Sequence, residues 1–154
     1  MISAPPPKPS LMAALVIGAL LPAVAWAGFP GNFNNEYEAP IERDPTALLG
    51  FDRSKENGVR FVERFDVSNL HFSCGDGTTE RVIVSFPDQI LPIVGGRFEG
   101  KVKTSTMLPR VLKVEGKLQS GGRAKGLMSM RTRSDVAESR CYTGVLRWKT
   151  TPDT

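Results

Sequence analysis

The sequence from Gly96 to Arg131 reads GRFEGKVKTSTMLPRVLKVEGKLQSGGRAKGLMSMR, and it decides the fold class. Apolar or small residues alternate with charged or polar ones in each of its three segments, at 98–103, 112–118 and 124–131. A period of two is typical of a β-strand that buries one face. Pro109 and the glycines after Ser120 interrupt the alternation where turns are expected. The stretch therefore predicts three consecutive strands.

The same period extends on both sides of this stretch. Further strands are expected at 59–67, 70–74, 82–86 and 141–149. Glu63 interrupts the apolar face of the first and indicates a bulge or a rim position. Pro87 is expected to end the third, and the apolar stretch 89–96 is cut by Pro92, which suits an edge or a loop crossing. About seven strands must bury their apolar faces together, which predicts an all-β fold, an antiparallel β-sandwich or flattened barrel.

Residues 1–27 have the pattern of a signal peptide. Lys8 precedes an uncharged apolar run, and Ala25-Trp26-Ala27 supplies the small residues that a signal peptidase needs. Cleavage between Ala27 and Gly28 is expected. A retained anchor helix is the alternative, but the run is shorter than the roughly 20 apolar residues of a usual membrane span. The sequence thus predicts a secreted or periplasmic protein with no stable membrane span after cleavage.

The remaining chain has the length of one domain, since the whole sequence has 154 residues. Residues 28–50 are rich in asparagine, glycine and proline and have no sustained period, so they are expected to form a flexible arm. The β-sandwich domain is expected to span 51–154.

Cys74 and Cys141 are the only cysteines. An even number of cysteines in an exported chain predicts a disulfide, which would stabilise the fold by about 4 kcal/mol through loop entropy. The two thiols are too far apart for a redox Cys-x-x-Cys motif, and one histidine makes them a poor zinc set. The pair would tie an early strand to the start of the last one.

Short glycine-spaced motifs carry a resemblance over residues 58–149. They are Gly-Arg-Phe-Glu-Gly at 96–100, Val-Glu-Gly-Lys-Leu at 114–118, Ala-Lys-Gly-Leu at 124–127 and the closing Cys141-Tyr-Thr-Gly-Val-Leu-Arg-Trp148. Together with Cys74, this order resembles a class of uncharacterised exported proteins, chiefly actinobacterial, that look like small β-sandwiches with two cysteines and a C-terminal Cys-x-x-Gly-x-x-x-Trp motif. The resemblance implies a fold and export, and it implies no activity.

Catalytic motifs are weak in this sequence. His71 is the only histidine, its position predicts a solvent-facing side chain, and no Gly-x-Ser-x-Gly elbow is present. Asp76 lies in a Cys-Gly-Asp-Gly-Thr-Thr stretch that reads as a turn, because one carboxylate is far short of a calcium site. Glu99 and Glu115 are expected to form ordinary cross-strand ion pairs with nearby lysines. We therefore expect no catalytic residues, no metal and no cofactor.

Trp148 shares one alternating face of the last predicted strand with Tyr142 and Leu146. Both aromatic rings could stack on a sugar, but the shared face predicts that they belong to the core.

Basic residues occupy many outward positions of the predicted strands, in a chain of net charge +4 and pI near 9.3. Acids interspersed with them favour an ordinary solvated face, while an anionic envelope polymer or glycan is the ligand that such a face would bind. The candidate binding residues are Lys101, Lys103, Lys113, Lys117, Lys125 and Arg131. No aromatic ladder interleaves them, so no nucleic acid is expected.

The expected function is therefore that of a non-catalytic secreted or envelope module. A small extracellular enzyme that acts on glycans, through two carboxylates in one cleft, is one alternative. A secreted inhibitor that uses the polar loop 132–140 is another.

Overall fold

The computed structural model describes residues 35–150, so the predicted leader, its predicted cleavage site and residues 28–34 of the predicted arm lie outside the described part. Nearly all of the described chain is β-structure. The strands are β1 (Tyr37–Ile41), β2 (Asp44–Glu56), β3 (Val59–Cys74), β4 (Thr79–Pro92), β5 (Arg97–Lys103), β6 (Arg110–Leu118), β7 (Ala124–Thr132), β8 (Cys141–Tyr142) and β9 (Leu146–Lys149). One 3-10 turn, Ala137–Ser139, precedes β8. The all-β prediction is confirmed.

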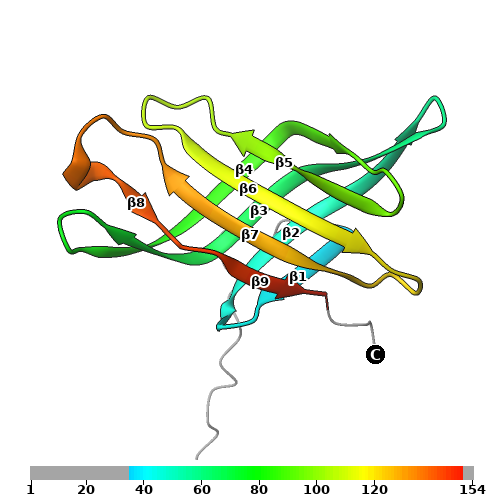
Figure 1. Cartoon of the computed structure of the whole chain (residues 1–154), viewed down its shortest axis with the longest axis horizontal. Coiled ribbons are helices and arrows are strands. Elements are labelled where there is room, and N and C mark those ends of the chain that lie inside the picture. Colours follow the sequence, from blue (N-terminus) through cyan, green and yellow to red (C-terminus); the bar gives the residue numbers. More distant parts are fainter. Residues whose placement is uncertain (1–34, 151–154) are drawn as a thin grey trace, which may run out of the picture.

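The strands form one antiparallel sheet that closes on itself. Its order is β4-β3-β2-β1-β9-β7-β6-β5, and β8 pairs with both β3 and β7. The ring β3-β2-β1-β9-β7-β8 is thus a closed six-stranded barrel, to which β4 on one side and β6 and β5 on the other are added. Figure 1 shows that β5, β6, β7 and β9 cross in front of a layer made by β2, β3 and β4. The flattened barrel is therefore the form that the fold takes.

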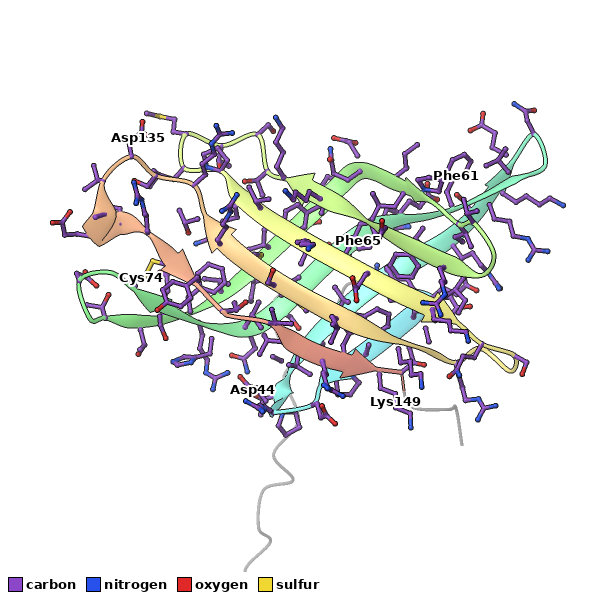
Figure 2. The ribbon with its side chains drawn as sticks, viewed as in Figure 1. Asp44, Phe61, Phe65, Cys74, Asp135 and Lys149 are labelled. Atoms are coloured by element: carbon purple, nitrogen blue, oxygen red, sulfur yellow. A yellow bond between two sulfur atoms is a disulfide. The ribbon has the colours of Figure 1, made fainter. Side chains whose placement is uncertain are left out.

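Aromatic side chains fill the space between the two layers. Phe51 and Phe65 come from the rear layer (Phe65 is labelled in Figure 2), and their ring centroids lie 5.5 and 6.4 Å from that of Phe98 in the front layer. Phe98 and Trp148 stack with centroids 6.2 Å apart. All four rings are buried, so burial of aromatic surface is a large source of the stability of this domain.

Two glycines make room for these rings. Phe98, Gly116, Gly126 and Trp148 are directly opposite one another across β5, β6, β7 and β9. A Cβ atom on Gly116 would lie 2.7 Å from Cζ2 of Trp148, and one on Gly126 would lie 2.6 Å from the same atom. The indole ring therefore lies directly on the glycine backbone. Each of the four glycine-spaced motifs of the sequence contributes one residue to this row.

The prediction of a flexible arm over 28–50 is wrong from Tyr37 onward. Tyr37, Ala39 and Ile41 are buried in β1, and Leu49 and Phe51 are buried in β2. The rings of Tyr37 and Phe51 stack at 4.9 Å from opposite positions of the two strands. Pro40 and Pro45 interrupt a stretch in which the buried residues nonetheless keep a period of two. The domain therefore begins at Tyr37 or earlier and not at residue 51.

The irregularity predicted at Glu63 is confirmed as a bulge. The register of β3 with β4 shifts between Glu63 and Phe65, and Arg64 between them has a φ of 52°. A second shift, between Val67 and Leu70, coincides with Asn69 at a φ of 53°. The two predicted strands 59–67 and 70–74 are consequently one long strand, because bulges let β3 bend around the barrel without ending.

Pro87 does not end a strand, and β4 continues to Pro92. Glu63 pairs with Ile90 and Phe65 with Phe86, so Pro87 lies in the part of β4 that the bulge leaves out of register. A missing N–H is tolerated there because β4 is at one end of the strand order.

The predicted last strand, 141–149, is divided in two. Thr143 to Val145 belong to no strand, and Gly144 has a φ of 71°. The break is required because β8 pairs with β3 and β7, whereas β9 pairs with β7 and β1. Tyr142, predicted in the core, is instead 59% exposed, while Trp148 is buried as predicted.

A polar cluster joins the start of β2 to β3 and β4. The Thr46 hydroxyl donates to Asp44 Oδ1 at 2.7 Å, and the Arg81 guanidinium donates to Asp44 Oδ2 at 2.9 Å and to the carbonyl of Asn69 at 2.8 Å. The Thr46 hydrogen bond, with a further contribution from Arg81, holds the pKa of Asp44 below its ordinary 3.8.

Thr46→Val is expected to raise the pKa of Asp44 back toward its ordinary value, while Thr46→Ser leaves it low. Because the folded pKa lies below the unfolded one, the cluster stabilises the fold above the unfolded pKa, and this stabilisation is lost as the pH falls through the folded pKa. The gain is less than about 1 kcal/mol, since the side chains are partly exposed. Titration of the Asp44 carboxyl by NMR checks this; equal pKa values in the two variants would contradict it.

Candidate functional site

The candidate binding residues all lie on one surface. Along β5, β6 and β7 they alternate with buried side chains such as Val102, Val114 and Met128. They are exposed on the outer side of the front layer, which is made by β5, β6, β7 and β9. We call this outer side the basic face. The residues are Lys101, Lys103, Lys113, Lys117, Lys125 and Arg131.

Strand register places like charges opposite each other on the basic face. Arg97 is opposite Lys117, which is opposite Lys125, which is opposite Lys149. We call these residues the cationic row. In the same way, Lys101 is opposite Lys113.

The two carboxylates of the basic face, Glu99 and Glu115, are also opposite each other. The prediction that these acids pair with cross-strand lysines is therefore wrong. The register places each acid opposite the other acid and each of these lysines opposite another base. Among residues 35–150 the ion pairs involve none of the lysines of this face.

Several arginines elsewhere on the molecule are paired. Arg53 lies 3.0 Å from Glu36, Arg64 lies 2.8 Å from Asp52, and Arg81 lies 2.9 Å from Asp44. Among residues 35–150, Arg147 is the only cation of the basic face that forms an ion pair, with Glu42 at 4.0 Å, and both side chains are well exposed. Like charges directly opposite each other destabilise a sheet. The basic face therefore carries an electrostatic cost that a bound anion would relieve.

Two grooves cross the basic face. The larger has a volume of about 1070 Å³. It is lined by the cationic row and by Glu99, Glu115 and Arg147, with Pro40 and Pro92 among its other residues. The smaller has a volume of about 420 Å³ and is lined by Gln89, Lys101, Lys103, Val111, Arg131 and Arg133. No carboxylate from the described residues lines the smaller groove, so it is the more strongly positive of the two.

Sequence reasoning missed Arg97 as part of this surface, and it placed Arg133 and Lys149 outward without including them among the six candidate residues. All are exposed. The period of two places each of them outward, so their exposure could be predicted from the sequence. Their alignment with Lys117 and Arg131 depends on strand order and register, which no single strand reveals.

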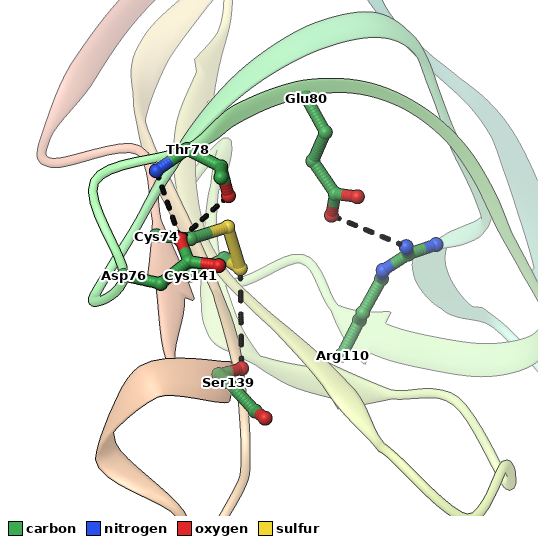
Figure 3. Close-up of a disulfide and its surroundings, with 7 residues drawn as sticks. All are labelled: Cys74, Asp76, Thr78, Glu80, Arg110, Ser139 and Cys141. Carbon is green, nitrogen blue, oxygen red and sulfur yellow. Dashed lines mark hydrogen bonds and ion pairs between the residues drawn. A yellow bond between two sulfur atoms is a disulfide. The ribbon is translucent and has the colours of Figure 1, made fainter.

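The predicted disulfide is present, and it links β3 to β8. Cys74 and Cys141, 67 residues apart, are directly opposite each other in β3 and β8. The bond therefore crosses the seam at which β8 closes the barrel (Figure 3). Glu80 lies close to both sulfur atoms, but these are consumed by the disulfide and offer no thiolate to a metal.

Asp76 forms the turn that its sequence predicts. The backbone N–H and the hydroxyl of Thr78 donate to Asp76 Oδ1 at 2.8 and 2.6 Å, and they lower the pKa of this carboxyl (Figure 3). Gly77 has a φ of 84°, which an Asp-Gly turn accommodates.

His71 is exposed and lies opposite Arg81 on β4, as its outward position predicts. Neither hydrogen bonds nor ion pairs connect its ring to other side chains among residues 35–150. It has no partner there that would make it a catalytic base.

No known protein family, curated protein or solved structure matches this chain. Within residues 35–150, no helix has the length and apolar character needed to cross a membrane.

Proposed function

We propose that this protein is an exported, non-catalytic module that binds an anionic envelope ligand, a polymer or a glycan, on its basic face. The observation that carries the proposal is the cationic row, which aligns across β5, β6, β7 and β9 positive side chains that form no ion pair within residues 35–150. The leader pattern and the disulfide support an oxidising location outside the cytoplasm. The resemblance to exported two-cysteine sandwich proteins agrees with that location.

The spacing of the row suits a linear polyanion. Neighbouring strands lie about 4.8 Å apart, so the row extends over roughly 14 Å with one positive charge at each step. A chain with regularly repeated negative groups can contact several of these charges at once. Each contact would also screen the repulsion between neighbouring lysines.

Removing two cations of the row is expected to weaken binding of a polyanion. Lys117→Gln/Lys125→Gln should bind inorganic polyphosphate at least about tenfold more weakly at low salt and show a shallower dependence on salt, because fewer counterions are released. Lys55→Gln/Arg60→Gln is the matched control. It removes the same charge from opposite, exposed positions of the β2–β3 hairpin. Isothermal titration over a series of salt concentrations measures both; equal losses in the two variants would show that only net charge matters.

One observation favours a second candidate function, hydrolysis of a glycan. Glu99 and Glu115 line the larger groove from directly opposite positions. Cβ atoms so placed are about 5 Å apart, and two carboxyl groups at a similar separation serve retaining glycosidases. Glycosidase carboxylates, however, flank the scissile bond from two sides. Here both side chains project from one sheet in the same direction, and both are exposed.

Glu99→Gln/Glu115→Gln separates the two candidates. A binding face should hold polyphosphate more tightly in this variant, since two repelling charges are removed. A hydrolase should lose all release of reducing sugar from a glycan substrate. Hydrolysis by the original protein that the variant lacks would replace the first proposal with the second.

A further inference from the structure

Apolar side chains project from two loops at one end of the basic face. Met107 is fully exposed, and Leu108 next to it is 55% exposed, both in the loop between β5 and β6. Val136, in the loop between β7 and β8, is 56% exposed. The N–H of Arg133 donates to the carbonyl of Pro109 at 2.7 Å and so joins the two loops. Figure 1 shows them side by side at the upper left.

Hydrogen bonds fix the shape of the β5–β6 loop. Across its base, Thr104 and Arg110 are joined twice, by the Thr104 N–H to the Arg110 carbonyl at 3.0 Å and by the Arg110 N–H to the Thr104 hydroxyl at 2.9 Å. The Thr106 hydroxyl donates to the carbonyl of Leu108 at 3.1 Å. The loop thus holds its methionine in water although the core nearby buries others, Met128 and Met130.

A row with cations and an aromatic ring crosses the strands at the base of these loops. Lys103, Val111, Arg131 and Tyr142 are opposite one another across β5, β6, β7 and β8. The first three line the smaller groove, and Tyr142 is 59% exposed. Positive charge, an amphipathic ring and exposed apolar side chains therefore occur together at this end of the molecule.

This combination has a specific use. Apolar side chains at the tip of a fixed loop gain free energy by entering the boundary between headgroups and acyl chains of a bilayer. Lysine and arginine beside them are attracted to anionic headgroups, and tyrosine favours the interface. A soluble polyanion would satisfy the cations but would leave Met107 and Leu108 in water.

We propose that this end of the basic face docks on the surface of a bilayer that contains anionic lipid, with Met107 and Leu108 entering the headgroup region. The inference rests on the proposed anion binding and names its ligand as a lipid phosphate at a membrane surface. Lys103, Arg131 and Arg133 contact the phosphates, and the loop supplies the contact that a free polymer cannot use.

Sedimentation with vesicles tests the proposal, using the exported chain and either phosphatidylcholine alone or phosphatidylcholine mixed with phosphatidylglycerol. The original protein should bind only the mixed vesicles. Met107→Ser/Leu108→Ser should lose at least about tenfold in vesicle affinity and should bind inorganic polyphosphate unchanged. Val59→Ser/Ile83→Ser, which removes two exposed apolar side chains from β3 and β4, is the matched control and should bind both probes normally.

The outcomes keep the two proposals separate. If the Met107/Leu108 variant sediments like the original protein, or if the original protein binds polyphosphate but not the mixed vesicles, docking on a membrane is wrong and a soluble polymer is the ligand. If neither probe binds, the basic face does not bind anions and both proposals fail.

Discussion

Gly126→Ala should lower the free energy of unfolding by about 3 kcal/mol, near the upper end of what overpacking costs in a core. The added Cβ atom would collide with the carbonyl oxygen of Glu115, lie 2.8 Å from Cα of Gly116 and lie 2.6 Å from Cζ2 of Trp148. Two of these atoms belong to the backbone of the neighbouring strand and cannot rotate away. The sheet between β6 and β7 must therefore separate, or the indole ring must leave its position. Urea denaturation followed by circular dichroism measures the effect.

Gly100→Ala is the matched control for this substitution. The three atoms nearest to its Cβ atom would all belong to the side chain of Leu91, which can adopt another rotamer. We expect a loss of less than about 1.5 kcal/mol, as for a tolerated change of volume in a core. Equal losses at Gly100 and Gly126 would mean that contact between Trp148 and the glycine row does not organise the core.

Removal of the disulfide, by Cys74→Ser/Cys141→Ser, is expected to lower the free energy of unfolding by about 4 kcal/mol. A loop of 67 residues is then released in the unfolded chain. The folded state is weakened as well, because β8 contains only Cys141 and Tyr142 and meets β3 only at Ser73 and Cys74. Thermal unfolding of the variant, and of the original protein with and without reductant, measures the loss.

Hydrogen exchange shows whether that loss includes opening of the barrel. In the serine variant the amides of β8 should exchange much faster, while those of the β2–β3 pairing, away from the seam, should keep most of their protection. An unchanged melting temperature on reduction would contradict the role of the bond in stability. Unchanged protection of β8 would contradict its role in closing the seam.

The sequence predicted well those parts of the fold in which local pattern and final structure agree. The alternation at 112–118 and 124–131 predicted β6 and β7. One charged residue on an apolar face indicated the bulge at Glu63. The sequence predicted poorly those parts in which pairing with a distant strand decides the secondary structure. Residues 37–50 have the composition of a linker, and their strands become evident only from the pairing of β1 with β2, in which Tyr37 stacks on Phe51. Tyr142 alternates correctly with Trp148, but the turn at Gly144 places the two in different strands.

The candidate site was predictable to a similar degree. An outward position for each lysine follows from the period of two, and all six candidate residues lie on one face. Whether Lys117 is opposite an acid or another base depends on the register of β5 with β6. A register shifted by two residues would place Glu99, and not Arg97, opposite Lys117. The loops that carry Met107 and Arg133 come together because the β6–β7 pairing places Arg110 opposite Thr132.

The most direct test of the central proposal, anion binding on the basic face, is a map of amide chemical-shift changes during titration of the isotopically labelled protein with inorganic polyphosphate. We predict that the changes concentrate on outward positions of β5, β6, β7 and β9, above all at Lys117 and Lys125, and that they disappear at high salt. Changes confined to the β2–β3 hairpin, around Lys55 and Arg60, or spread evenly over the surface would contradict the proposal.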